Sequence, residues 1–301
     1  MNVQTIDWDT FDRDGIVSLG RVVDDDVAIA LGARADDLAA GRFENPHVRL
    51  QADTGGDYDA LPEAVTGFAE SGTPYRKVQG LEHDDRFRDV LALPIVTEIC
   101  DRTYGAHAGI SIFRAMVMNK PATQGTVLPW HQDGGTVWGL DRDPLVTLWL
   151  ALDDATPESG CMDVIPGSHR LGLLSTLGST LAPEAAARHC PPDRVRNLPV
   201  ARGEMVMFHN WLIHRSGVNH SHLPRRAFTT CLMDARTISV STGQRFSLLR
   251  GDAPTAPYRF VEQMEIDLAF LRDTAARSEE YALSLAEEVV RLQGELEATN
   301  P

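Results

Sequence analysis

The sequence predicts a mainly β protein, a sandwich or barrel with helices at its flanks. After residue 109, short segments rich in β-branched and aromatic residues follow one another, separated by clusters of Pro, Gly and Asp. Helical patterns stand before and after this region. The length of 301 residues does not decide between one and two domains, because β barrels of about 200–250 residues often form a single domain.

The amino-terminal part is expected to hold the flanking helices. Residues 24–41 combine acidic residues at the start with a glycine at the end, as a helix requires. Residues 84–104 predict two helices, since Pro94 suits the first turn of the second. Residues 43–75 are expected to form a long loop with one helix at 60–70. A loop of that length often serves as a lid or binding segment.

The β region contains five segments with strand character, and one interruption. The interruption, residues 171–200, is expected to be a loop with a short helix. The strand segments are residues 110–120, 145–154, 161–167, 203–214 and 226–235.

A final segment returns to helix. Leu285, Val289, Leu292 and Leu296 form a short amphipathic stripe. We therefore divide the chain into a domain at 1–255 and a helical extension at 256–301. The extension either packs on its own domain or makes a dimer contact, so the protein is expected to be a monomer or homodimer.

The balance of charge excludes one class of partner. The formal net charge is −15, from 28 basic and 43 acidic residues. Nucleic-acid binding needs clustered Lys and Arg, so no nucleic-acid partner is expected. A negative field raises the local concentration of cations, which favours a neutral or cationic small-molecule substrate, such as an amino sugar.

Three observations predict a cytoplasmic protein without a membrane partner. No stretch approaches the roughly 20 apolar residues that span a bilayer. The acidic start of the chain lacks the apolar core of a signal peptide. The four cysteines have no CxxC spacing, so we expect them to be reduced and buried rather than zinc ligands.

Two HxD tripeptides occur, and their contexts differ. His83 opens a helical pattern, in which positions i and i+2 point in different directions, so it is expected to be a surface or capping residue. His131 and Asp133 lie where strand character has begun, and in a strand i and i+2 share a face. Two glycines follow and allow a turn at a rim. His131 and Asp133 are therefore the candidate metal ligands.

The choice of the third ligand rests on its offset in sequence from an arginine. His209 and His214 are the two candidates, and Arg225 follows His214 by eleven residues. The same offset from His209 reaches His220, which cannot replace a guanidinium. Two His and one carboxylate leave the opposite positions of an Fe(II) ion open, as in non-haem oxygenases. An arginine beside them can bind a carboxylate of 2-oxoglutarate through two hydrogen bonds.

Several ordered blocks resemble the phytanoyl-CoA dioxygenase family of Fe(II)/2-oxoglutarate oxygenases over residues 8–235. They are FDRDGIVSLGRVVDDD near the start, RKVQGL at 76–81, MNKPATQGTVLPWHQDGG at 118–135, VTLWLALDDATPESGCMDVIPGSHR at 146–170 and GEMVMFHNWLIHRSGVNHSHLPRRAFT at 203–229. The segment beyond about residue 255 is not covered.

The resemblance implies a double-stranded β-helix, or jelly roll, with Fe(II), 2-oxoglutarate and O2 as reactants. It implies His131, Asp133 and His214 as iron ligands. For 2-oxoglutarate it implies Arg225, Ser216, Lys77, Met116 and Trp149. Related halogenases lack the triad carboxylate, so Asp133 argues for oxygenation rather than halogenation.

Three functions are consistent with this sequence. The first is an oxygenase of specialised metabolism that hydroxylates, cyclises or desaturates a small molecule, with a pocket drawn from 45–75, Trp138 and 236–256. The second is an acyl-CoA 2-hydroxylase, which the acidic charge supports poorly. The third is a jelly-roll binding protein that has lost catalysis, against which the intact triad and Arg225 argue.

Overall fold

The computed structural model describes residues 5–43, 45–53, 55, 58, 61–67, 74–175 and 180–251. The elements before residue 109 are α1 (Trp8–Asp14), β1 (Ile16–Arg21), α2 (Asp25–Ala39), β2 (Arg49–Ala52), β3 (Val65–Thr66), β4 (Tyr75–Gln79), the 3-10 turn η2 (Leu81–His83), α3 (Asp85–Leu91) and α4 (Pro94–Tyr104).

The β-rich part follows without a long helix. Its strands are β5 (Ile110–Lys120), β6 (Leu128–His131), β7 (Val146–Ala151), β8 (Met162–Val164), β9 (Arg196–Leu198), β10 (Glu204–His209), β11 (His214–Ser216), β12 (Arg225–Asp234) and β13 (Leu248–Arg250). Between them lie α5 (Pro183–His189) and the 3-10 turns η3 (Thr136–Trp138), η4 (Ser168–Leu171) and η5 (Pro192–Arg194).

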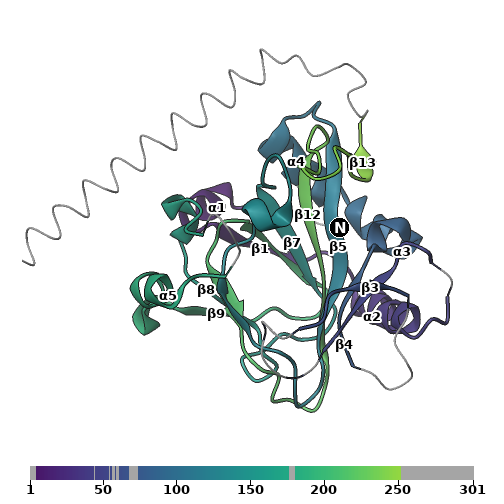
Figure 1. Cartoon of the computed structure of the whole chain (residues 1–301), viewed down its shortest axis with the longest axis horizontal. Coiled ribbons are helices and arrows are strands. Elements are labelled where there is room, and N and C mark those ends of the chain that lie inside the picture. Colours follow the sequence, from purple (N-terminus) through teal and green to yellow (C-terminus); the bar gives the residue numbers. More distant parts are fainter. Residues whose placement is uncertain are drawn as a thin grey trace, which may run out of the picture. The chain divides into compact units, whose positions relative to one another are not determined.

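The strands form two antiparallel sheets, as a double-stranded β-helix requires. The major sheet has the order β1-β10-β7-β12-β5-β4-β2-β3, with β13 also paired to β5. The minor sheet has the order β6-β11-β8-β9. Figure 1 shows β8 and β9 to one side of β5, β7 and β12, with α2 and α3 to the other. The predicted fold class is confirmed.

The alternation of side chains along the major strands explains these layers. On β12, Phe228 and Leu232 join the core that includes residues of α2, α3 and α4. Ala227, from the opposite face of the same strand, packs with residues of the minor sheet. Successive side chains of a strand point to opposite faces, so each major strand contributes to both layers. A cavity lies between this second face and the minor sheet.

A partly buried ionic network holds α2 on the outer face. Arg226 forms ion pairs with Asp153 at 2.7 Å and with Asp36 of α2 at 2.7 Å. The Tyr75 hydroxyl donates to Asp36 at 2.6 Å. Arg226 thus belongs to the structural face of β12, and its neighbour Arg225 faces the interior between the sheets.

The predicted helices at 24–41 and 84–104 are confirmed. Asp25 and Asp26 occupy the first turn of α2. Pro94 begins α4, and Gly105 ends it. The short helix expected within 171–200 is α5. The predicted strand segments correspond to β5, β7, β8, β10 with β11, and β12.

The helix expected at 60–70 is wrong in the part that the structure describes. Residues 61–64 have no regular structure, and Val65 and Thr66 form β3. Arg49 and Leu50 of β2 pair with them, and β2 in turn pairs with β4. This edge of the sheet depends on partners distant in sequence, which local patterns do not reveal.

The carboxy-terminal helix and the division at residue 255 lie outside the described residues and stay predictions. Chain contacts divide the protein into Met1–Ala253 and Pro254–Pro301. In the described part of the chain, no helix has the length and apolarity needed to cross a membrane.

Candidate metal and co-substrate site

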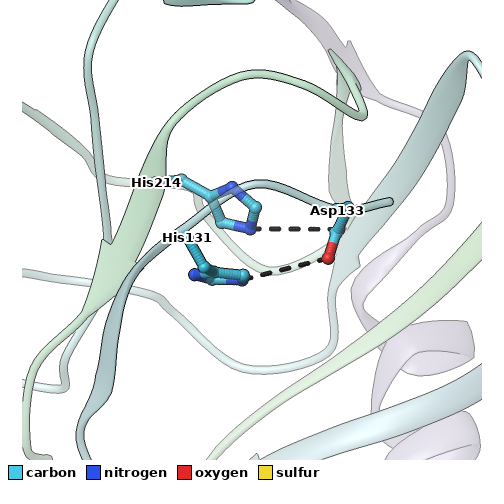
Figure 2. A group of neighbouring side chains, drawn as sticks. All are labelled: His131, Asp133 and His214. Atoms are coloured by element: carbon cyan, nitrogen blue, oxygen red, sulfur yellow. Dashed lines mark ion pairs between the residues drawn. The ribbon is translucent and has the colours of Figure 1, made fainter. Parts of the chain in front are cut away.

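Two paired strands of the minor sheet, and the turn that follows one of them, bring His131, Asp133 and His214 together. His131 ends β6 and His214 begins β11, and the two are cross-strand partners. Asp133 Oδ1 lies 3.9 Å from His131 Nε2, and Asp133 Oδ2 lies 4.0 Å from His214 Nε2. One potential ligand atom from each residue lies within 4.8 Å of the others (Figure 2). Within the described ranges, this is the single such group of three or more His, Cys, Asp or Glu residues.

The hydrogen bonds of both histidines prepare them for a metal. His131 Nδ1 lies 2.9 Å from the Pro129 carbonyl oxygen, and His214 Nδ1 lies 2.9 Å from the Leu212 carbonyl oxygen. A carbonyl only accepts, so each Nδ1 carries a proton, and in the neutral form of the ring Nε2 keeps its lone pair. Burial also lowers the pKa of His131 well below its usual range, which keeps that ring neutral. Both Nε2 atoms are therefore suited to bind a cation.

Asp133 is held by a turn rather than by the strand. β6 ends at His131, so the expectation that both ligands lie on one strand face is wrong for Asp133. The Asp133 amide donates to the Asn210 carbonyl at 2.7 Å. Gly134 has φ of 143°, and a Cβ there would lie 2.6 Å from Asp143 Oδ2. The double glycine thus permits the turn that brings Asp133 to the histidines.

Arg225 lies in the interior without an acidic partner. It is 3% exposed, and Nη2 donates to the Gly160 carbonyl at 2.9 Å. Its Nε has no hydrogen-bond partner, and among the described residues no carboxylate forms an ion pair with it. Burial lowers its pKa to about 10. A buried guanidinium with unused donors is costly unless an anion completes it.

The structure brings the other predicted residues to the same cavity. Trp149 lies under Arg225, with the guanidinium carbon 5.6 Å from its ring centroid. Lys77, Met116 and Ser216 also line the cavity, together with Arg225 and the three candidate ligands. The cavity has about 950 Å³ of atom-free space, counting the part open to solvent. Its lining combines apolar side chains with a few convergent polar groups, as small-molecule sites do.

Sequence reasoning missed several cavity residues. Lys120 is the cross-strand partner of Arg225 and donates from Nζ to the Thr126 carbonyl at 2.8 Å. Lys77 and Lys120 are the only lysines of the chain, and both line the cavity. The presence of only two lysines in the sequence could have singled out Lys120 as well as Lys77. Burial lowers the pKa of each lysine to about 7, and Arg225 adds to the effect on Lys120.

The two histidines that the sequence did not favour as metal ligands, His83 and His209, lie outside the candidate metal site. His83 stacks on His47 with ring centroids 3.9 Å apart. His209 accepts a hydrogen bond from the Trp211 amide at 3.0 Å, and burial lowers its pKa to about 4. Neither residue belongs to the metal-ligand group. The four cysteines are free and buried, as expected.

The expected substrate segments contribute unequally to the cavity. Trp138 and Tyr58 line it. The described residues 236–250 are not among its lining residues. Phe246, from that loop, instead packs on Phe113 with ring centroids 5.5 Å apart. It thus joins an apolar cluster that includes Trp138 and Cys231, which do line the cavity.

Comparisons with known proteins agree with this geometry. The family model described as phytanoyl-CoA dioxygenase (PhyH) matches residues 11–227. The chain is 32% identical to phytanoyl-CoA dioxygenase domain-containing protein 1 of Mus musculus over 160 residues, which is 51% of this chain and 54% of the mouse protein. The matched part thus spans about half of that relative's length.

Two solved structures share the fold. The epimerase SnoN, in complex with Fe3+, alpha ketoglutarate and nogalamycin RO, has a TM-score of 0.57 and 21% identity, covering 81% of this chain and 94% of SnoN. The carbocyclase SnoK from nogalamycin biosynthesis has a TM-score of 0.58 and 21% identity, covering 81% of this chain and 92% of SnoK.

Proposed function

Because the chain belongs to the phytanoyl-CoA dioxygenase family, we propose that it is an Fe(II)- and 2-oxoglutarate-dependent dioxygenase that oxidises a small molecule. The observation that carries the proposal is the position of Arg225. The buried Arg225 guanidinium has no carboxylate partner among the described residues. It lines the same cavity as His131, Asp133 and His214, whose potential ligand atoms lie close together. Such a pair of features suits a metal and a dicarboxylate together.

His131, Asp133 and His214 would hold the iron. Their donor set of two imidazoles and one carboxylate is the one that leaves coordination positions open for reactants. The Pro129 and Leu212 carbonyls fix the two rings in the required tautomer. When bound, the iron with 2-oxoglutarate supplies the activation of O2 and the removal of a substrate hydrogen.

Arg225 would bind the far carboxylate of 2-oxoglutarate. Its unused Nε and its charge complement that group, and the Trp149 ring restricts the guanidinium from one side. Ser216, which is 4% exposed, offers a hydroxyl to the same cavity. Lys77 and Met116 are proposed as further contacts. These residues orient the co-substrate and keep water away from it.

A specialised metabolite is the proposed substrate class. SnoN and SnoK, whose fold this chain shares, come from nogalamycin biosynthesis, and SnoN has been solved in complex with nogalamycin RO. One is an epimerase and the other a carbocyclase. One fold thus supports different outcomes, and hydroxylation, cyclisation and desaturation all remain open to this chain. The acyl-CoA substrate of the family's name is the alternative.

The cationic substrate expected from the net charge finds no support in the cavity. That expectation rested on the whole chain, whose charge is −15. Among the described residues, the cavity lining carries several cationic side chains and one carboxylate, that of Asp133. A small-molecule substrate stays the proposal. We keep the cytoplasm as the proposed location and a monomer or homodimer as the proposed state, with neither a nucleic acid nor a membrane as partner.

The function is tested by spectroscopy and turnover. Anaerobic protein with Fe(II) and 2-oxoglutarate should show the charge-transfer absorption of the chelate, and Asp133→Ala should lose both this band and succinate formation. Arg225→Gln should raise the Kd for 2-oxoglutarate by about 10- to 150-fold, because a charge-assisted hydrogen bond contributes about 1.5–3 kcal/mol.

Arg86→Gln is the matched control. Arg86 is exposed on α3, so this variant should keep the wild-type band and affinity. An Asp133→Ala variant that retains full coupled turnover would contradict the proposed function. Stimulation of 2-oxoglutarate turnover by an acyl-CoA, with none by small metabolites, would favour the alternative substrate.

A further inference from the structure

The cavity holds more positive charge than one 2-oxoglutarate accounts for. Three of its cations have partners within the protein. Arg76 donates to Gln51 Oε1 at 2.8 Å, Lys120 donates to the Thr126 carbonyl, and Arg215 pairs with Asp163 at 3.0 Å. The cationic lining residues are Arg76, Lys77, Arg114, Lys120, Arg215 and Arg225. With Arg225 and Lys77 proposed for the co-substrate, Arg114 is left without a role.

Arg114 stands in a bulge of β5. Met116 pairs with Thr229 of β12, but Phe113 pairs with Cys231. Arg114 and Ala115 therefore oppose Thr230 alone, which defines a β-bulge. Arg114 has φ of 60°, a left-handed conformation that an arginine adopts at a cost in stability. Bulges beside active sites redirect a side chain, and such strain is a reason to look for a function.

The side chain of Arg114 is fixed in place but not neutralised. Its guanidinium carbon lies 4.7 Å from the Phe113 ring centroid and 4.6 Å from that of Trp138. The two rings contact each other at 5.1 Å. No ion pair or hydrogen bond to another described residue satisfies the guanidinium. Stacking on aromatic faces leaves the N–H edge of an arginine available to a ligand.

Arg114 lines the same cavity as the candidate metal ligands, but its backbone position differs from that of Arg225. Burial raises the pKa of the Cys231 thiol to about 12; the Asp133 carboxylate raises it further and the Arg114 guanidinium opposes the rise. Arg114, Asp133 and Cys231 all line the one cavity. Along β5, however, Arg114 is six residues from Lys120, the partner of Arg225, or about 20 Å at the rise of a strand. The two guanidiniums thus start from well-separated backbone positions, which favours a different ligand for each.

We propose that Arg114 is the substrate-binding residue for an anionic group, and that the substrate is a small organic anion carrying a carboxylate or a phosphate. This inference rests on the proposed function. The guanidinium would bind two oxygens of that group through its N–H edge, with Trp138 behind it. The rest of the substrate would then extend along Met116 toward the metal ligands.

The test uses four probes that share one ring: cyclohexanecarboxylate, cyclohexyl phosphate, uncharged cyclohexanecarboxamide and cationic cyclohexylmethylamine. Binding to the full-length protein is measured by ligand-observed NMR, anaerobically, with Fe(II) and saturating 2-oxoglutarate so that Arg225 is occupied. At least one anion should bind ten-fold or more tightly than the amide and the amine. The better of the two anions identifies the group.

Variants assign the binding to Arg114. Arg114→Gln should weaken binding of the anion ten-fold or more, and Arg114→Lys should weaken it less. Arg86→Gln should leave the affinity for the anion unchanged. Circular dichroism and thermal unfolding establish that each variant is folded. Equal binding of the amide or amine, an unaffected Arg114→Gln variant, or displacement of the anion by 2-oxoglutarate would each overturn the proposal.

The proposed function and the role of Arg114 are tested by different outcomes. A missing charge-transfer band would reject the Fe(II)/2-oxoglutarate site. Binding of the anion to metal-free protein, and its loss in Arg114→Gln, would still be measurable and would still decide the role of Arg114.

Discussion

Two non-glycine residues in the described part of the chain have positive φ, Arg114 and Thr123. Thr123 is exposed in the turn after β5, whereas Arg114 lies within the strand. The left-handed conformation costs an L-residue about 1–2 kcal/mol. Stacking on Phe113 and Trp138 offsets part of this cost, since an exposed cation–π contact contributes about 0.5–1 kcal/mol. The strain at Arg114 should therefore be measurable once its side chain is removed.

We expect Arg114→Gly to be more stable than Arg114→Ala by about 1 kcal/mol, because both lose the guanidinium but only glycine relieves the backbone. Urea unfolding of the two variants measures the difference. At Ser18, exposed on β1 with an ordinary φ, Ser18→Gly should instead be less stable than Ser18→Ala by about 0.5–1 kcal/mol. If alanine is as stable as glycine at position 114, the strain is absent.

At the residue scale, the sequence selected the three residues that the structure brings together as candidate ligands, but it selected fewer of the other cavity residues. The HxD pattern and the offset from His214 to Arg225 were local signals. Arg114 gave none, because the bulge that places it is set by the pairing of β5 with β12. Lys120 was also missed. Side-chain alternation counted along β5 changes phase at the bulge, so a strand pattern alone could not assign the inner face.

At the element scale, Gln132 connects three segments behind the metal site. Its side chain donates to the Gly172 carbonyl at 2.8 Å and to the Trp211 carbonyl at 2.7 Å. Its Oε1 accepts from the Leu174 amide at 2.7 Å. Gln132 is fully buried and stands between His131 and Asp133. The three bonds thus fix the peptide that carries two of the candidate ligands.

Gln132→Leu should lower the free energy of unfolding by about 2–4 kcal/mol, because it leaves buried carbonyl and amide groups without partners. It should also weaken Fe(II) binding by about 10- to 100-fold, the usual effect of losing a group that supports metal ligands. Denaturant unfolding and anaerobic Fe(II) titration measure the two effects. Gln244→Leu, in an exposed loop, should change stability by less than about 0.5 kcal/mol. Unchanged iron affinity in a destabilised Gln132→Leu would contradict the positioning role.

Most elements of the fold were readable in the sequence, and those that were not share a cause. β5, β7 and β12 lie at the centre of the major sheet and are rich in β-branched and apolar residues. β2 and β3 lie at its edge and are short. Their pairing with β4 stabilises them more than their own residues do, so a local reading placed a loop and a helix there.

At the scale of the whole molecule, an acidic chain surrounds a cationic cavity. The only two lysines of the sequence line that cavity. Burial, together with Arg225 and Arg76, lowers the pKa of Lys120 to about 7 despite the opposing charge of Asp53. Folding without ligands therefore carries an electrostatic cost, and an anion bound in the cavity should reduce it. The protein should be more stable when its co-substrate is present.

This cost predicts how stability depends on pH. The pKa of Lys120 is about 7 in the folded protein, against 10.5 for a lysine in the unfolded chain, so between these values the unfolded chain binds more protons. Stability should then rise with pH across this window. The rise should amount to a few kcal/mol, since one pKa unit corresponds to about 1.4 kcal/mol. Lys120→Met should remove the contribution of Lys120 to the increase of stability with pH. The contribution of Lys77 should remain in that variant.

Because the chain has two lysines, their titration can be followed directly. In protein labelled with 13C-lysine, both Cε signals should titrate near pH 7 in the absence of ligand, and Lys120→Met should remove one of them. In the wild type, saturating 2-oxoglutarate should move the pKa values of both lysines upward, because the added negative charge favours the ammonium form. It should also flatten the rise of stability with pH. Lysines that titrate near 10.4 without ligand would show that the cavity does not impose this cost, and the stabilisation by 2-oxoglutarate would then need another source.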